Sequence, residues 1–295
     1  MGNWDLIKEL DIKDLTHEEF IRLAYMIILL RPVDDVGLSD WLERARSGEF
    51  SRSDLINTLV NSPEFKMVHN LPFHQIVHEA RKEWIISIPP FKTILDIGGL
   101  HTREPMGAMI SMGYKHRPDE LVILDLPDED RLLGGDAEHL YGSFQYSWGT
   151  IHYIRESAED LKTVQELREK KFHCIHMGQV LEHIRINKVA EVLKWIRDHL
   201  APGGQFVFDT PNRLVTVMHS PDRYVDGDHK YEYNPEEVSD LLGDTGFQIL
   251  YSVGILHMPL SYRTGKFNPM EAYEAQYITD DLEASYLLGY RCAIA

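Results

Sequence analysis

Apolar positions recur at helical spacing along the first part of the chain. Three runs place apolar side chains on one helical face, over residues 16–30, 37–48 and 51–62. Each run is closed by a residue that ends helices: Pro32, Gly48 and Pro63. The pattern therefore predicts a small helical module, over residues 1–68.

The hydrophobic pattern changes after residue 66. Residues 71–88 predict an amphipathic helix that ends at Pro89-Pro90. Short apolar runs then alternate with helical ones, which is typical of an α/β fold with a doubly wound sheet. We therefore predict a second domain over residues 69–295. Its expected strands are residues 93–97, 121–124, 151–154, 172–177, 205–209, 248–254 and 286–293.

Composition and charge limit the classes of function. There are 30 Lys and Arg residues against 47 Asp and Glu residues, a formal charge of −17. This balance argues against nucleic acid as a partner and against adhesion to an anionic membrane, since both need clustered basic residues. Two cysteines exclude a disulfide framework. Without an apolar run long enough to cross a bilayer or a visible signal peptide, we expect a cytoplasmic protein with no membrane insertion.

The chemistry is carried by motifs at the ends of the expected strands. The first strand contains Asp96 and runs into Gly98-Gly99, and the second ends in Asp125. Leu181-Glu182-His183 follows the fourth strand, and Leu200-Ala201-Pro202-Gly203-Gly204 precedes the fifth. In this order the residues resemble a class I S-adenosylmethionine-dependent methyltransferase, over roughly residues 71–295. The resemblance implies a Rossmann-like, seven-stranded, mostly parallel sheet and S-adenosylmethionine as the cofactor.

The resemblance also implies how the cofactor is held. A loop without Cβ atoms allows close approach of the backbone, and ligands of such sheets bind at the carboxyl ends of the strands. Asp125 would accept the ribose hydroxyls and Asp96 would position the methionine ammonium, whereas the alternative for both is a structural role at a strand end. Adenine would contact Ser157 and Ala158, for which side-chain packing is the alternative. The implied cofactor-binding residues are Asp96, Gly98, Gly99, Asp125, Leu126, Ser157, Ala158 and Gln179.

Two departures from the family pattern concern the glycine loop. Leu100 and Thr102 stand where the family usually has glycine. The interval from Asp96 to Asp125 is also longer than the roughly 20 residues of comparable nucleotide-binding units. These departures leave open a non-catalytic cofactor-binding or scaffold protein. A methyltransferase acting on RNA or protein is a further alternative.

Catalysis by in-line methyl transfer requires alignment of the acceptor and, for a hydroxyl, removal of a proton. His183 is the first candidate for the base because it follows the fourth strand, although a structural histidine bonded to backbone is the alternative. The segment after the fifth strand resembles the acceptor lid of small-molecule and sugar methyltransferases. This likeness assigns His229 and Tyr233 to the acceptor pocket as further catalytic candidates, with lid packing as the alternative.

The same segment also carries candidate ligands for a metal ion. His219, Asp226, Asp228 and His229 are residue types that ligate divalent cations. Because Asp-Gly-Asp is also a common turn, the sequence predicts no metal. Glu182 is expected to cap a helix or to make a structural bond.

The helical module resembles a small bacterial domain related to the phycobilisome linker. The likeness covers residues 16–65 and rests on Phe20-Ile21-Arg22, Leu30-Arg31-Pro32, Gly37-Leu38 and Ser62-Pro63-Glu64-Phe65. That domain often accompanies enzymes of cell-surface polysaccharide synthesis.

We therefore predict transfer of a methyl group to an oxygen, or a nitrogen, of a small-molecule or sugar acceptor in surface-glycan or secondary metabolism. Residues 257–284 are expected to shape the acceptor pocket or a homodimer contact.

Overall fold

The computed structural model describes residues 15–69, 71–127 and 140–295. Contacts divide the chain into two compact units, Met1–Ile76 and Val77–Ala295. The expected boundary after residue 68 stays a prediction. No helix within the described ranges is long and apolar enough to cross a membrane.

The first unit is helical, as its sequence pattern predicts. Thr16 and Glu19 form a capping box at the start of the helix at residues 17–28, and Gly48 ends the helix at residues 35–47 with a φ of 80°. Ser62 with Pro63 was expected only to end a helix, but it also begins a further one. The helices are α2 (His17–Ile28), α3 (Asp35–Ser47), α4 (Arg52–Val60) and α5 (Pro63–Val68). Their buried core consists of Phe20, Ile21, Ala24, Tyr25, Ile28, Leu29, Val33, Trp41, Leu55 and Leu59.

The second unit is built on one mixed sheet in the order β3-β4-β2-β1-β5-β6-β9-β7-β8. The five strands from β4 to β6 in this order run parallel. Strand β9 pairs antiparallel with β6 and with β7, so β7 runs in the same direction as the five parallel strands. The strands are β1 (Thr93–Ile97), β2 (Glu120–Asp125), β3 (Gly142–Tyr146), β4 (Gly149–Arg155), β5 (Phe172–Gly178), β6 (Leu200–Pro211), β7 (Phe247–His257), β8 (Ile278–Thr279) and β9 (Ser285–Ile294).

The prediction of seven strands was wrong, because the sheet has nine strands within the described part of the chain. The seven expected strands are all present, and the additional two lie at the edges. Strand β3 forms a hairpin with β4, where the ring of Phe144 packs edge-on against that of Tyr153 at 6.0 Å. Strand β8 lies in the insertion over residues 257–284 and pairs with β7. Both edge strands are short or partly exposed, so their apolar pattern carries little signal.

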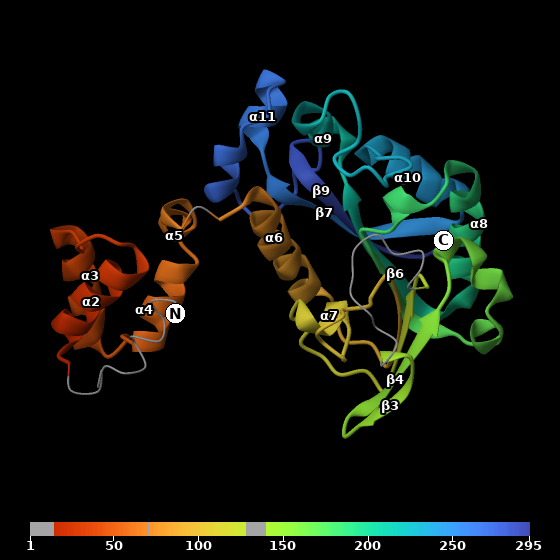
Figure 1. Cartoon of the computed structure of the whole chain (residues 1–295), viewed down its shortest axis with the longest axis horizontal. Helices are drawn as coiled ribbons and strands as arrows, with labels where there is room; N and C mark the ends of the chain where they lie inside the picture. The colour runs from red at the N-terminus through yellow and green to blue at the C-terminus, as the bar shows by residue number, and fades with distance from the viewer. Residues whose placement is uncertain (1–14, 70, 128–139) are drawn as a thin grey trace. The chain divides into compact units, whose positions relative to one another are not determined.

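Helices cover both faces of this sheet, which explains why its parallel strands are apolar on both sides. Along β2, Val122 and Leu124 pack in one core with α8 (Ile186–His199) and α10 (Pro235–Asp244). Ile123 faces the other side, toward the start of α7 (Ala108–Ser111). Figure 1 shows α8 and α10 on one side of the sheet, with α7 and the later part of α6 (Phe73–Ser87) on the other.

The two cysteines are fully buried. Burial raises the pKa of Cys174 well above its usual range and raises the pKa of Cys292 to about 12. Since the thiolate is the nucleophile, neither thiol is expected to react in the folded chain at neutral pH.

We predict that the native protein resists alkylation by iodoacetamide at pH 7 and takes up a label at both cysteines after unfolding in guanidinium chloride. Intact mass before and after unfolding measures the labelling. Labelling of Cys174 in the native state at the unfolded rate would contradict its placement inside β5.

Candidate active site

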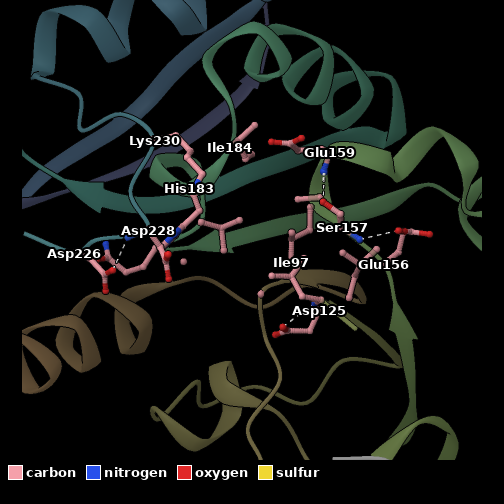
Figure 2. A pocket seen from close by; sticks show the side chains of 17 residues that line it. Ile97, Asp125, Glu156, Ser157, Glu159, His183, Ile184, Asp226, Asp228 and Lys230 are labelled. Atoms are coloured by element: carbon pink, nitrogen blue, oxygen red, sulfur yellow. Dashed lines mark hydrogen bonds between the residues drawn. The ribbon is translucent and has the colours of Figure 1, made fainter. Parts of the chain in front are cut away.

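A cavity of about 500 Å³ lies at the carboxyl ends of the parallel strands. Here the strand order reverses, because the chain runs outward from β1 to β2 and β4 on one side and to β5 and β6 on the other. Open α/β sheets bind their ligands at such a point. The cavity is lined by Ile97, Gly98, Leu124, Asp125, Leu126, Glu156, Ser157, Ala158, Glu159, Gly178, Gln179, Val180, His183, Ile184, Asp226, Asp228 and Lys230 (Figure 2).

Gly98 forms the tight turn that follows β1. Its φ is +75°, and a Cβ atom added there would lie 2.4 Å from Cγ2 of Val180. Its N–H donates to the carbonyl of Leu124 at 2.7 Å, which holds the turn against β2. Glycine is therefore required at this position both by the backbone conformation and by the space available.

Asp125 at the end of β2 is held by two backbone amides. Its Oδ2 accepts from the N–H of Leu100 at 3.0 Å, and its Oδ1 accepts from the N–H of Leu126 at 2.9 Å. An ionised carboxylate only accepts hydrogen bonds, which is the property that ligand hydroxyl donors require.

The altered glycine loop fits this arrangement. Leu100 and Thr102 are not among the residues with positive φ, so their backbone conformation does not require glycine. The longer interval before Asp125 includes a segment that returns to the loop, where the N–H of Ala108 donates to the carbonyl of Gly99 at 2.7 Å. The side chains of Leu100 and Thr102 are not among those that line the cavity, so the departures from the family pattern do not fill it.

Asp96 and Gly99 do not line the cavity, although both were expected to bind the cofactor. Asp96 is 1% exposed, and its Oδ1 lies 2.6 Å from Nδ1 of His176 on the neighbouring strand. A Cβ atom at Gly99 would lie 2.2 Å from Oδ2 of Asp96. Glycine at this second position makes room for a buried carboxylate, and the cofactor-binding role of both residues stays a prediction.

Ser157 and Ala158 form one wall beyond the end of β4. The hydroxyl of Ser157 accepts from the N–H of Glu159 and caps the short helix η3 (Ala158–Thr163). Oε1 of Glu156 accepts from the N–H of Ser157 at 3.0 Å. The wall is thus fixed by local hydrogen bonds between side chains and backbone amides. Both residues line the cavity, and their contact with adenine stays a prediction.

Gln179 follows β5 in a left-handed conformation, with a φ of 58°. Its backbone N–H and its side-chain Nε2 both donate to Asp209, at 2.9 Å each. Asp209 is fully buried and also pairs with Arg81 of α6, whose Nε lies 2.7 Å away. Gln179 lines the cavity, but its amide donates to Asp209.

The opposite wall carries His183, Asp226, Asp228 and Lys230 (Figure 2). His183 ends the short helix η5 (Leu181–His183) after β5. Desolvation, and then the charge of the neighbouring His229, lower the pKa of His183. The candidate base therefore lies on the cavity wall, and its catalytic role stays a prediction.

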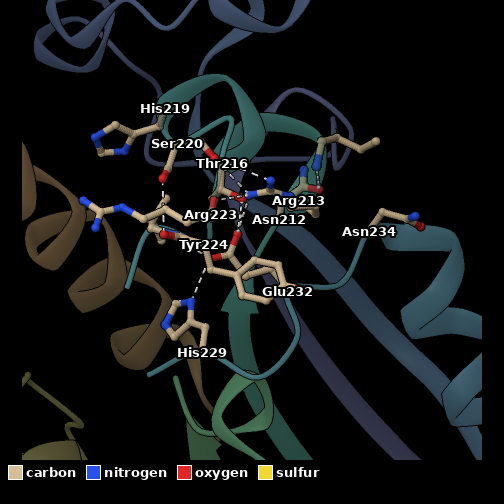
Figure 3. Close-up of polar contacts among 12 residues, drawn as sticks. Asn212, Arg213, Thr216, His219, Ser220, Arg223, Tyr224, His229, Glu232 and Asn234 are labelled. Carbon is tan, nitrogen blue, oxygen red and sulfur yellow. Dashed lines mark hydrogen bonds and ion pairs between the residues drawn. The ribbon is translucent and has the colours of Figure 1, made fainter. Parts of the chain in front are cut away.

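His229 is anchored by a buried carboxylate (Figure 3). Its Nδ1 lies 2.7 Å from Oε1 of Glu232, which is 1% exposed and also bonds to Thr216 and to the N–H of Val225. Burial disfavours the charged imidazole, but the bond to Glu232 and nearby acids outweigh it and raise the pKa of His229. His229 lines a second cavity, of about 480 Å³, which shares Asp226 with the first.

Tyr233 and Glu182 are both buried. Tyr233 packs edge-on against Tyr231 in the sheet core, burial raises its pKa to about 12, and it is not among the residues that line either cavity. Glu182 makes the expected structural bond, accepting from Oγ1 of Thr210 at 3.0 Å, and does not cap a helix. Burial raises the pKa of Glu182 to about 7.

Several cavity residues were missed by the sequence reasoning. Glu156 and Glu159 flank the expected Ser157-Ala158 pair, so a wider window at the end of β4 would have found them. Lys230 follows His229 in the chain, but Lys230 lines the first cavity, of about 500 Å³, whereas His229 lines the second. Val180 and Ile184 carry no signal beyond their place after β5.

Comparison with known proteins agrees with this architecture. The profile of a methyltransferase domain matches residues 86–252, which is more than half of the 295 residues. The chain belongs to the methyltransferase domain family, and its class is that of an S-adenosylmethionine-dependent methyltransferase. Residues 7–68 match a domain of unknown function (DUF4214), which is not described as a phycobilisome linker.

Individual relatives are distant. A Mycolicibacterium smegmatis protein named "Probable S-adenosylmethionine-dependent methyltransferase" is 33% identical over 81 residues, which span 27% of this chain and 30% of that protein. A chain of the solved complex between the Haloferax volcanii Trm112 methyltransferase activator and a methyltransferase shares the fold. Its TM-score is 0.51 at 14% identity, covering 76% of this chain and 92% of that one. The structure of an S-adenosylmethionine-dependent methyltransferase of Thermotoga maritima has a TM-score of 0.49 at 14% sequence identity. The match covers 78% of this chain and 92% of that one.

We predict that Gly98→Ala destabilises the chain and weakens binding of S-adenosylhomocysteine. The left-handed conformation and the contact with Val180 together are expected to cost about 2 kcal/mol or more of unfolding free energy. Gly203→Ala is the matched control, because Gly203 has a similar φ of +73° but open space around it. The control should lose about 1 kcal/mol and keep its affinity. Denaturant unfolding and calorimetric titration measure both, and equal affinities of the two variants would contradict the site.

Proposed function

We propose that the chain transfers a methyl group from S-adenosylmethionine to an oxygen, or a nitrogen, of a small polar acceptor such as a sugar. The observation that supports this most directly is the division of the cavity. One end has the Asp125 carboxylate and the Ser157-Ala158 wall, and the other has His183 with three charged side chains. A single cavity thus offers a cofactor half and an acceptor half.

The residues of the cofactor half fit the cofactor. Gly98 leaves space where any Cβ would meet Val180, and Asp125 presents a fixed carboxylate at the end of β2. The cavity volume of about 500 Å³ is within the usual range for small-molecule sites. When bound, S-adenosylmethionine supplies an electrophilic methyl group on its sulfonium.

The acceptor half carries charged side chains that can bind and orient the acceptor. Asp226, Asp228 and Lys230 can orient a polar acceptor by charge-assisted hydrogen bonds. Two acids beside one lysine suit a small molecule with hydroxyl or amino groups better than a phosphate backbone. The net charge of −17 supports the same choice of acceptor. A role in surface-glycan metabolism is supported only by the enzymes of cell-surface polysaccharide synthesis that often accompany the domain that the helical module resembles.

We predict that Asp125→Asn weakens binding of S-adenosylhomocysteine by about tenfold or more, because an amide loses charge and turns a donor toward a backbone N–H. Asp119→Asn is the control, since Asp119 is an exposed acid just before the opposite end of β2. Thermal unfolding with and without excess S-adenosylhomocysteine gives the comparison. An unchanged ligand-induced shift in Asp125→Asn would remove Asp125 from the site.

Methyl transfer itself is tested by mass spectrometry. The chain is incubated with S-adenosylmethionine and a panel of sugars, alcohols and amines, and S-adenosylhomocysteine and methylated products are measured. We expect turnover with at least one small acceptor and strongly reduced turnover in Asp125→Asn. Binding of S-adenosylhomocysteine without turnover on any acceptor would favour the non-catalytic alternative, and turnover on RNA alone would favour a nucleic-acid acceptor.

A further inference from the structure

Three side chains of types that ligate metals converge beside the cavity, behind the wall that carries His183. Ligand atoms of Glu182, His183 and His229 all lie within 4.8 Å of one another. The rings of the two histidines meet edge to face, with centroids 4.8 Å apart and planes at 84°. His183 also lines the cavity, so the cluster is in contact with the space where an acceptor would bind.

One oxygen of this cluster is buried without a protein partner. Oε2 of Glu182 accepts from Thr210 at 3.0 Å, but Oε1 has no hydrogen bond although the residue is fully buried. Buried carboxylate oxygens are costly unless they are paired or bind a metal. The unused oxygen therefore points to a ligand that is not part of the protein.

His229 is oriented from outside the cluster. Its Nδ1 bonds to the buried Glu232 at 2.7 Å, which leaves Nε2 as the atom that can ligate. A carboxylate that holds the far nitrogen of a histidine is the usual outer support of a metal-bound imidazole. Glu182 has a comparable support in Thr210. Two of the three side chains are thus held by protein partners in a ligating orientation.

We propose that Glu182, His183 and His229 bind a divalent cation at the acceptor end of the cavity. Two imidazoles and one carboxylate with open positions suit a first-row cation such as Zn²⁺, Fe²⁺ or Mn²⁺. Asp226 and Asp228 on the same wall add negative charge and are available as further ligands. The cation would neutralise the buried carboxylate of Glu182, and Oε1, which has no partner in the protein, would become one of its ligands. This set replaces the sequence-based expectation of no metal.

The cation also restricts the chemical class of the acceptor. This inference rests on the proposed function. A hydroxyl bound to a cation loses its proton more readily, and its oxygen still has lone pairs for attack on the methyl group. An amine has a single lone pair on nitrogen, and binding to the cation occupies it. In the transfer the acceptor O–H bond breaks and an O–CH₃ bond forms. The S–CH₃ bond breaks with its electron pair remaining on sulfur, and the proton passes to solvent. The acceptor is therefore an oxygen nucleophile.

Binding of Co²⁺ to the full chain tests the site without reference to activity. The metal-free protein is titrated with Co²⁺, followed by visible absorption and calorimetry. We expect saturable binding of one ion, weakened about tenfold or more by Glu182→Gln and by His183→Gln. Glu182→Gln keeps the shape and the bond to Thr210 while removing a buried charge, so it should fold. His257→Gln is the control, since His257 pairs with Asp281 outside the cavity.

Activity then separates this proposal from the proposed function. Chelation should lower transfer to hydroxyl acceptors at least tenfold, leave the affinity for S-adenosylhomocysteine unchanged, and be reversed by added cation. Co²⁺ binding in a chain that transfers no methyl group would support the metal site and reject the proposed function. No Co²⁺ binding by the wild type, or equal binding by the folded Glu182→Gln, His183→Gln and wild-type proteins, would overturn the metal site. Transfer that persists unchanged after chelation would overturn its role.

Discussion

The reversal of strand order between β1 and β5 is the constraint on which the rest of the structure depends. Strands on either side run parallel, so their carboxyl ends meet at one edge and their following loops diverge. The left-handed turn at Gly98 lets the backbone leave β1 without filling the gap. The cavity, its cofactor end and its acceptor end all follow from this one edge of the sheet.

Buried polar groups give the site its precision, and they come from distant parts of the chain. Asp209 on β6 holds Gln179 after β5 and Arg81 on α6, which links three elements behind the cavity. Glu232 holds His229 in the same way from within the acceptor segment, residues 213–233. Such fully bonded carboxylates fix side-chain positions because breaking any one bond would leave a buried charge unpaired. Glu182 differs from these two carboxylates because its Oε1 has no hydrogen-bond partner in the protein, and the proposed cation would pair with that oxygen.

Much of the fold could be predicted from the sequence. The apolar runs located all seven central strands, since a buried parallel strand has apolar side chains on both faces. The edge strands β3 and β8 were missed because two to five partly exposed residues give no distinct alternation. In the site, Gly98, Asp125, Ser157 and His183 could be located at the cavity because each lies at the carboxyl end of a strand or within five residues after it. Asp96 and Gly99 were also chosen from the motif, but the direction of the Asp96 side chain depends on His176 of the neighbouring strand.

The sequence by itself determined the class of protein, because local spacing of strands, glycines and acids is sufficient to define a cofactor-binding sheet. Only the tertiary structure decided which groups share a cavity. Glu182 and His229 are separated along the chain by α8, β6 and the helix α9 (Arg213–His219), and no spacing rule links them. Packing of the acceptor segment over the end of β5 brings them together, with the backbone of Lys230 bonded to the carbonyl of Glu182 at 2.7 Å. Long-range contacts of this kind depend on the whole sheet being formed, and they are what places a metal-ligating set beside the cofactor cavity.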